Sequence, residues 1–239
     1  MLISTLALVL AAANGPQWLG VSLGEPVAAV RASLGDPLDE EDLGDGLTKS
    51  RYFAADNTAF LGVDWKNGVV VMLSFEPLQG ESATTADPSG AKIGDTEARI
   101  QAIRGKPDST DNGDGADRWN YGSDPAWRYI FRNGTLAMII ASSLKSMPDA
   151  QHAPPVPPLH TGASIANAIV IKGENEMTGI EWEHAYLAYH PCSGDRKREL
   201  LKQALIVNGK RSFDALTTRC PGNDPQTLYF DITDYIGKL

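Results

Sequence analysis

Residues that can transfer protons gather in the last third of the chain. Glu181, Glu183 and His184 lie close together in the sequence, and Asp231 lies near the carboxyl end. A carboxyl group and an imidazole within hydrogen-bonding reach can act as acid and base in a hydrolytic reaction. No spacing fixes the distances between them, and surface carboxylates beside one half-buried histidine explain the same residues. They define an alternative hypothesis, a hydrolase-like enzyme with a site around Glu181, His184, Cys192 and Asp231.

Metal and cofactor motifs are missing from the sequence. On a helix, His184 and His190 point about 120° apart, and on a strand they lie about 20 Å apart, so they cannot share one metal ion. The Asp-rich run 111–117 resembles a calcium loop but lacks the terminal glutamate. Nucleophile-elbow, P-loop and dinucleotide-binding fingerprints do not occur either. We therefore expect no catalytic residue, no metal and no cofactor.

The cysteine content predicts a disulfide. Cys192 and Cys220 are the two cysteines of the chain. In an oxidising compartment, a pair within one small domain is most simply a disulfide.

Composition and the first residues favour an exported globular protein. The hydrophobic content is 42%, the charged content is 21%, and the net charge of −9 argues against affinity for nucleic acid or for an anionic membrane. Residues 1–13 are apolar and end in Ala11-Ala12-Ala13, which fits a signal-peptidase site, and the run is too short to span a bilayer. No later stretch is long enough either, so we expect a periplasmic or secreted protein without a membrane span.

Two stretches of the chain are alike. Residues 21–37 align without a gap on residues 91–107, an offset of 70 positions. Both read apolar-Gly-acid, an apolar helical stretch, and Gly-x-Pro, as expected when a left-handed glycine ends a helix before a proline. We expect tandem repeats at residues 17–78 (the first segment) and 89–146 (the second segment). Such a duplication is typical of a scaffold or a binding surface.

The first segment is predicted to have a helix from Glu25 to about Leu34, and the second a helix that Asp95 caps. Strands are predicted to follow each helix. A Gly/Asp-rich loop is predicted after each helix, at 39–48 and 108–117. Asn67-Gly68 and Asn133-Gly134, each between apolar runs, then predict tight hairpins, because both turn positions favour positive φ. Each segment is expected to be a helix packed on a small antiparallel sheet with its own hydrophobic nucleus.

These residues resemble a known fold. Three features of the first segment recur in the second. The helix signature Gly24…Leu34-Gly35-x-Pro37 recurs as Gly94…Gly105-x-Pro107, and Tyr52 recurs within Trp119-x-Tyr121. The hairpin Trp65-x-Asn67-Gly68-Val69 recurs as Phe131-x-Asn133-Gly134. They resemble the repeats of the β-lactamase-inhibitory-protein-like fold, which is shared with outer-membrane-assembly lipoproteins of the SmpA/OmlA type. The resemblance implies an α+β fold. None of the inhibitor's contact residues falls on the matching positions, and the lipoproteins' lipobox is missing.

The rest of the chain is expected to consist of linkers and a third unit. Residues 79–88 are a polar linker, and 147–161 are a proline-rich spacer. Residues 162–239 are expected to form a small α+β domain with the disulfide, containing a helix from Thr178 to His190 and a hairpin around Asn208-Gly209. This unit is similar to C-terminal modules of uncharacterised bacterial exported proteins that end in a Phe-Asp-Ile-Thr type strand.

Aromatic residues suggest where a partner binds. We expect three of them in the core, Trp127, Tyr129 and Phe131, because apolar residues stand at the matching positions of the first segment, Leu61, Val63 and Trp65. We therefore expect the other two, Trp119 and Tyr121, on an open sheet face, where aromatic residues are typical anchors for a protein partner. The leading hypothesis is an exported, non-catalytic protein that binds another protein or an envelope component there. A purely structural envelope protein is a further alternative.

Overall fold

The computed structural model describes residues 17–18, 20–53, 59–78, 86–143, 145, 151–173, 175–194 and 196–238. The expected signal segment 1–13, residues 79–85 of the first linker and residues 147–150 of the second lie outside this part of the chain. No helix within the described ranges is long and apolar enough to cross a bilayer.

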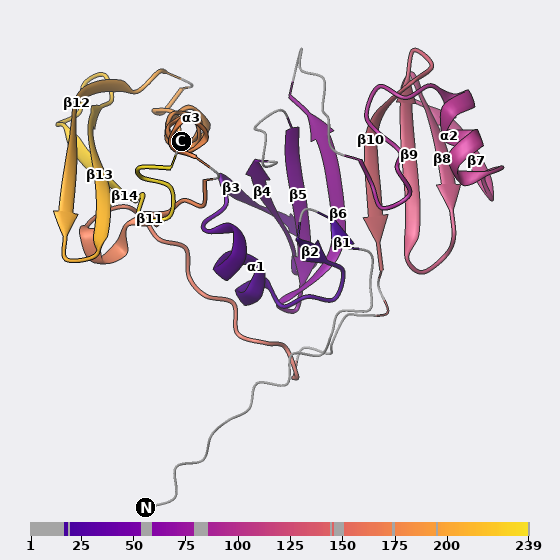
Figure 1. Cartoon of the computed structure of the whole chain (residues 1–239), viewed down its shortest axis with the longest axis horizontal. Helices are drawn as coiled ribbons and strands as arrows, with labels where there is room; N and C mark the ends of the chain where they lie inside the picture. Colours follow the sequence, from indigo (N-terminus) through magenta and orange to yellow (C-terminus); the bar gives the residue numbers. More distant parts are fainter. Residues whose placement is uncertain are drawn as a thin grey trace, which may run out of the picture.

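The described residues fold mainly into strands, with three α-helices and one 3-10 helix (Figure 1). The helices are α1 (Val27–Leu34), α2 (Glu97–Arg104), α3 (Glu176–Tyr189) and the 3-10 helix η1 (Ile165–Asn167). A two-stranded ladder joins β1 (Gln17–Trp18) and β2 (Val21–Ser22). An eight-stranded antiparallel sheet, the long sheet, contains in spatial order β3 (Asp39–Gly44), β4 (Leu47–Phe53), β5 (Ala59–Lys66), β6 (Val69–Pro77), β10 (Thr135–Ser142), β9 (Ala126–Arg132), β8 (Ala116–Tyr121) and β7 (Ser109–Gly113). The C-terminal sheet contains β11 (Ile169–Val170), β14 (Gln226–Asp231), β13 (Arg211–Arg219) and β12 (Glu199–Asn208).

The expected α+β fold class is wrong. The structure is 47% strand and 16% helix, so it is a mostly β protein. The difference arises after each of the first two helices, where the sequence predicted a loop. The predicted loops are instead the hairpins β3–β4 and β7–β8.

Asp-Gly pairs form these two hairpins. Asp45 and Gly46 have φ values of 52° and 72°, and Asp114 and Gly115 have 54° and 72°. Two successive positive φ values are the geometry of the tight hairpin turn that Asn-Gly and Asp-Gly both favour. The predicted Asn-Gly turns have the same geometry, with φ values of 51° and 73° at Asn67-Gly68 and 52° and 75° at Asn133-Gly134. The run around Asp114 is thus a hairpin turn and not a calcium loop.

The first and second segments make matching backbone hydrogen bonds. Gly24 donates its N–H to Val70 at 2.7 Å, and Gly94 donates to Leu136 at 2.8 Å. The bond that ends each helix also matches, because the N–H of Gly35 and that of Gly105 each donate to the carbonyl four residues earlier at 2.9 Å. Both glycines have positive φ, at 82° and 78°. Residues 24–37 and 94–107 therefore have the same local conformation.

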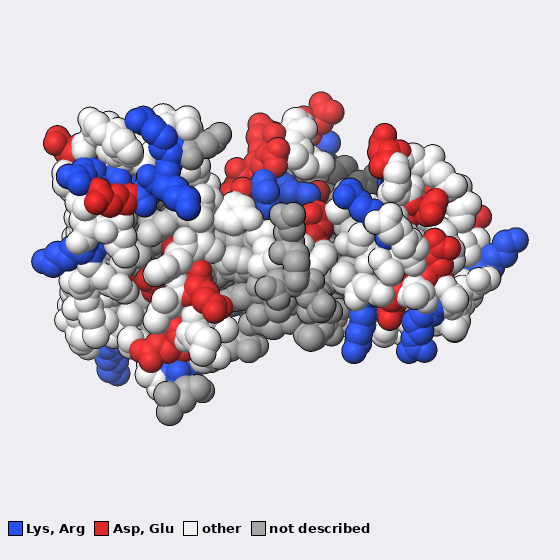
Figure 2. Space-filling model, turned by 90° about the horizontal axis from the view of Figure 1, so that it is seen from above, with Lys and Arg blue, Asp and Glu red and all other residues white. Residues whose placement is uncertain are grey.

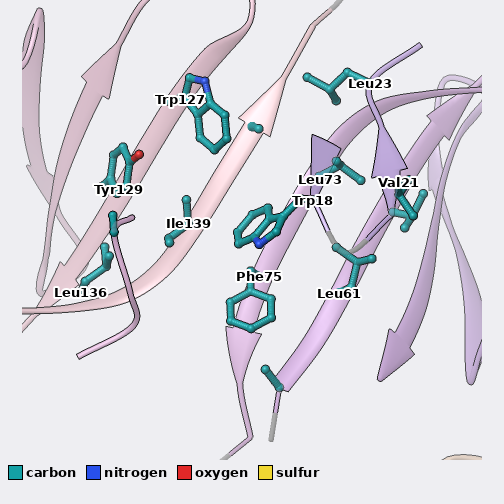
Figure 3. Close-up of a cluster of buried hydrophobic side chains, with 14 of the residues drawn as sticks. Trp18, Val21, Leu23, Leu61, Leu73, Phe75, Trp127, Tyr129, Leu136 and Ile139 are labelled. Atoms are coloured by element: carbon teal, nitrogen blue, oxygen red, sulfur yellow. The ribbon is translucent and has the colours of Figure 1, made fainter. Parts of the chain in front are cut away.

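The two segments share one hydrophobic core, so the expected separate nuclei are wrong. Their last strands, β6 and β10, pair directly, with Phe75 opposite Ile139. Trp18 packs against Phe75 at 5.0 Å and Trp127 at 6.4 Å between ring centroids, and thereby contacts both segments (Figure 3). The same cluster includes Tyr52, Leu61 and Leu73 from the first segment and Ile100, Tyr129, Leu136 and Ile139 from the second.

The C-terminal sheet is covered on one face by α3, and a second core lies between them and also includes Leu38 of the first segment, with Phe53 and Phe60 packed against it. Tyr186 of α3 contacts Phe230 of β14 at 5.5 Å between ring centroids. The helix begins earlier than predicted, because Asn175 is its N-cap and forms a capping box with Thr178. Capping boxes satisfy two backbone groups at a helix start, so Thr178 is the third helical residue and not the cap.

Backbone and ionic contacts link the C-terminal sheet to the first segment, beside which it lies in Figure 1. Asp36, which follows α1, donates its N–H to Val170 at 2.8 Å, and its carboxylate accepts the N–H of Val170 at 2.7 Å. His160 also lies 2.9 Å from that carboxylate. Arg31 of α1 donates to the carbonyl of Pro157, so the proline-rich segment runs along the first segment.

Charged side chains of both signs lie on the surface (Figure 2). In that view a group of acidic side chains stands over the middle of the molecule, and basic side chains lie toward both ends.

Candidate functional site

Five aromatic residues of the second segment lie on the face of the long sheet that packs into the core: Trp119, Tyr121, Trp127, Tyr129 and Phe131. The register places Trp119 opposite Tyr129 and Tyr121 opposite Trp127. Directly opposed residues of an antiparallel pair point to the same face. Tyr129 and Phe131 are completely buried and Trp127 is 8% exposed, as the sequence predicted.

The expectation that Tyr121 lies on an open face is wrong. Tyr121 is 6% exposed, and its hydroxyl donates to the carbonyl of Gly105 at 3.1 Å. Burial raises the pKa of this phenol above its ordinary value, although the nearby Arg104 opposes the shift. The guanidinium of Arg104 lies 5.2 Å from the Tyr121 ring centroid and 5.4 Å from that of Trp127. The rings of Tyr121 and Trp127 therefore pack against Arg104 inside the protein and do not form a docking surface.

Trp119 is only partly buried. Its ring packs on Phe131 at 4.8 Å between centroids and borders the core. Together with Gln101, Lys106 and Thr110, it also lines a cavity of about 350 Å³ between the end of α2 and the edge strand β7. We call this cavity the Trp119 pocket. Trp119 is therefore accessible at the end of the sheet and not on its open face.

The face of the long sheet away from α1 and α2 carries polar pairs in the second segment. Arg118 forms an ion pair with Asp111 at 3.1 Å, and Arg128 donates to the side chain of Asn120 at 2.8 Å. In the first segment, Arg51 forms ion pairs with Asp39 at 2.9 Å and with Glu41 at 3.0 Å. Aromatic anchors were expected on this face, but the register places them on the opposite one.

The residues of the hydrolase hypothesis do not come together. Asp231 points to the face of the C-terminal sheet opposite α3, where it pairs with Arg211 at 2.6 Å. Glu181 and His184 are exposed on α3, which packs on the other face. Cys192 is bonded to Cys220, so the predicted disulfide is present and Cys192 has no thiol. Among the described residues, no group of three or more metal-ligating side chains could hold a metal ion.

A buried carboxyl pair in the C-terminal unit was missed. Glu183 of α3 is 1% exposed, and Asp214 of β13 is 6% exposed. The hydroxyl of Tyr235 donates to Glu183, and the side-chain amide of Gln203 donates to Asp214. Gly179 makes room for this arrangement, because a Cβ there would overlap the ring of Tyr235. Burial raises the pKa of Glu183 to about 8.

The sequence holds a weak signal for this pair. Glu183 lies next to Trp182, which faces the core, and four residues after Gly179, an unusual residue inside a helix. These features hint that this side of α3 is buried, but only the tertiary structure brings Asp214 beside it.

No protein-family model matches the chain, and a search of curated proteins finds no match. Among solved structures, a cysteine-rich secretory protein from Staphylococcus aureus subsp. aureus Mu50 is similar at 14% identity and a TM-score of 0.38, over 54% of this chain and 48% of that one. An extracellular protein containing an SCP domain from Bacillus anthracis str. Ames is similar at 11% identity and a TM-score of 0.40, over 52% and 45%. A proposed β-lactamase inhibitor protein from Streptococcus mutans is similar at 17% identity and a TM-score of 0.20, over 50% and 83%.

The matched part spans about half the length of the first two of these structures. At TM-scores from 0.20 to 0.40, the three likenesses assign the chain to no family.

Proposed function

We propose that the protein is an exported, non-catalytic module that binds an extended segment of another protein at the β7 end of the long sheet. The observation that carries this proposal is the position of Trp119 in a cavity of about 350 Å³ beside the edge strand. Tryptophans that lie in pockets are common energetic anchors of protein interfaces.

The edge strand supplies the second element of the binding mode. β7 ends the long sheet, and its residues Ser109, Thr110, Asp111 and Asn112 are exposed. An unpaired sheet edge can accept a further strand through main-chain hydrogen bonds, while a neighbouring pocket selects a side chain. In this proposal the partner strand pairs with β7 and inserts an apolar side chain against Trp119.

Export is part of the same proposal. The Cys192–Cys220 disulfide supports it, because disulfides persist in oxidising compartments outside the cytosol. The apolar residues 1–13 support it as a signal segment. We also propose that residues 17–78 and 89–146 are two copies of one ancestral unit, which their matching hydrogen bonds support. We propose as well that 162–239 is a separate domain, which its own four-stranded sheet supports.

Affinity capture from the extracellular and envelope fractions tests the binding site. Wild type is expected to capture a discrete protein that then binds saturably in purified form. Trp119→Ala and Lys106→Glu should each weaken that binding at least tenfold. Lys106 is exposed, so its substitution tests the pocket without disturbing the core.

Tyr189→Ala is the matched control, because Tyr189 is an exposed aromatic residue on α3, outside the Trp119 pocket. It should bind as wild type does. Hydrogen exchange should also show new protection of the β7 amides in the complex. Undiminished binding by both pocket variants, or complex formation without protection of β7, would rule out this site.

A further inference from the structure

A second cavity, of about 290 Å³, lies between α3 and the β12–β13 hairpin. This volume is close to the lower end of the range for small-ligand sites. Its walls include the apolar side chains of Ile180, Leu205 and Ile232, and its polar lining includes the carboxyls of Glu183 and Asp214. Among the described residues no Lys, Arg or His lines it, so the lining is both apolar and acidic.

Within the described part of the chain, each of the two carboxyls accepts a hydrogen bond at one oxygen but not at the other. Tyr235 donates to one oxygen of Glu183, and Gln203 donates to one oxygen of Asp214. The second oxygen of each, Oε2 of Glu183 and Oδ1 of Asp214, has no donor among the described residues. Buried polar atoms nearly always have a hydrogen-bond partner, so two such oxygens on residues that line one cavity indicate a missing donor.

A proton can serve as that donor in the empty cavity. Both carboxyls line the same cavity, and desolvation together with the negative charge of Asp214 raises the pKa of Glu183 to about 8. At neutral pH Glu183 therefore holds a proton, as expected for a desolvated carboxyl beside a second acidic group. Glu176 and Tyr235 are the other titratable groups that line the cavity.

The opening of the cavity is apolar and accessible. Ile180 is 42% exposed and Leu205 is 59% exposed. An anion would be repelled by the carboxyls, and a neutral apolar ligand would leave their charge buried without a counterion. A primary ammonium group on an aliphatic chain supplies up to three N–H donors to the carboxyls and apolar surface to the walls.

We propose that the cavity bounded by Glu183, Asp214, Ile180 and Leu205 binds a primary aliphatic ammonium group, which displaces the proton of Glu183. The O–H bond of the Glu183 carboxyl breaks, the proton passes to solvent, and the ammonium forms the ion pair in its place. The same chemistry belongs to a free alkylamine and to a lysine side chain of a peptide.

Two-dimensional NMR titration of the whole protein with n-butylamine tests this site, with n-butanol as the uncharged comparison. Saturable shifts are expected at α3, β12 and β13 for the amine and not for the alcohol. Below pH 8 the apparent affinity should rise about tenfold per pH unit, because each ligand displaces one proton. Above the pKa of Glu183 it should level off.

Variants separate the carboxyl pair from general surface charge. Glu183→Gln and Asp214→Asn should each weaken binding of n-butylamine at least tenfold, and Glu183→Gln should also remove its dependence on pH. Glu181→Gln, the same change at an exposed position of the same helix, should bind as wild type does. A tripeptide with a central lysine and both ends blocked identifies the source: tighter binding than n-butylamine assigns the site to a peptide side chain, and weaker binding assigns it to a free amine.

Equal binding of butanol and butylamine would overturn the proposal, as would unchanged binding by folded Glu183→Gln protein. The absence of saturable shifts with both the amine and the peptide would do the same. The readout is independent of the Trp119 pocket, so the two proposals can fail separately.

Discussion

Asp64 is a buried carboxyl group in the middle of the long sheet. It is 3% exposed, and its Oδ1 finds no hydrogen-bond donor among the described residues. The facing residue on β4 is Lys49, whose charge lowers the pKa of Asp64, but burial outweighs it and raises that pKa to about 6. The folded protein thus binds this proton more tightly than the unfolded chain, in which the pKa is near 3.8.

We therefore predict a pH-dependent stability difference between wild type and Asp64→Asn. The contribution of Asp64 is most favourable below the unfolded pKa and is lost as the pH rises through about 6. Asp64→Asn should remove this loss, so the variant gains stability relative to wild type between about pH 4 and pH 6 and keeps that gain above pH 6. Urea unfolding at several pH values measures it.

Asp224→Asn, at an exposed position, is the control and should track wild type at every pH. If the difference between Asp64→Asn and wild type is the same at pH 4 and pH 7, burial does not raise the pKa of Asp64.

At the scale of elements, two equivalent helix ends differ in what packs against them. Gly35 ends α1 and Gly105 ends α2, both with positive φ. A Cβ at Gly35 would overlap the carbonyl oxygen of Val170, whereas a Cβ at Gly105 would meet nothing within 4 Å. The first helix end therefore also forms the contact with the C-terminal sheet.

Alanine substitutions at these two positions should separate backbone strain from packing. Gly105→Ala should cost about 1–3 kcal/mol in unfolding free energy, because φ of 78° with ψ of −162° is a backbone conformation that essentially only glycine adopts. Gly35→Ala should cost more and should increase hydrogen exchange at Val170 and Ile171, since the β11 backbone must move. Equal costs at the two positions, measured by urea unfolding, would show that the Val170 contact has no energetic role.

At the scale of the whole molecule, Trp18 joins the two segments. Its ring contacts Phe75 of β6 and Trp127 of β9 within one core (Figure 3). Trp18→Ala should destabilise the protein by about 3–5 kcal/mol, as for other fully buried aromatic residues. Because the core is shared, we expect faster hydrogen exchange both in β5 and in β9.

Leu43→Ala is the matched control, since Leu43 is an exposed apolar residue of the same sheet, and it should change the unfolding free energy by less than about 0.5 kcal/mol. A loss of protection confined to β5 after Trp18→Ala would mean that the two segments unfold independently.

Local signals in the sequence predicted much of the backbone. The glycines that end α1 and α2, the Asn-Gly turns and the disulfide follow from nearby residues, because φ preference and cysteine pairing depend on local chemistry. The same turn chemistry operates at Asp45-Gly46 and Asp114-Gly115, so the β3–β4 and β7–β8 hairpins were accessible from the sequence as well. Missing them gave the wrong fold class.

The tertiary structure alone decided which residues share a face and a core. Tyr121 and Trp127 lie 6% and 8% exposed on the same side because of the β8–β9 register, and a one-residue shift would reverse that placement. The β6–β10 pairing merges the two segments, and the packing of α3 brings Glu183 to Asp214. Such contacts join residues far apart in the chain, so no local preference encodes them; the sequence determines the units, and their packing determines the pockets.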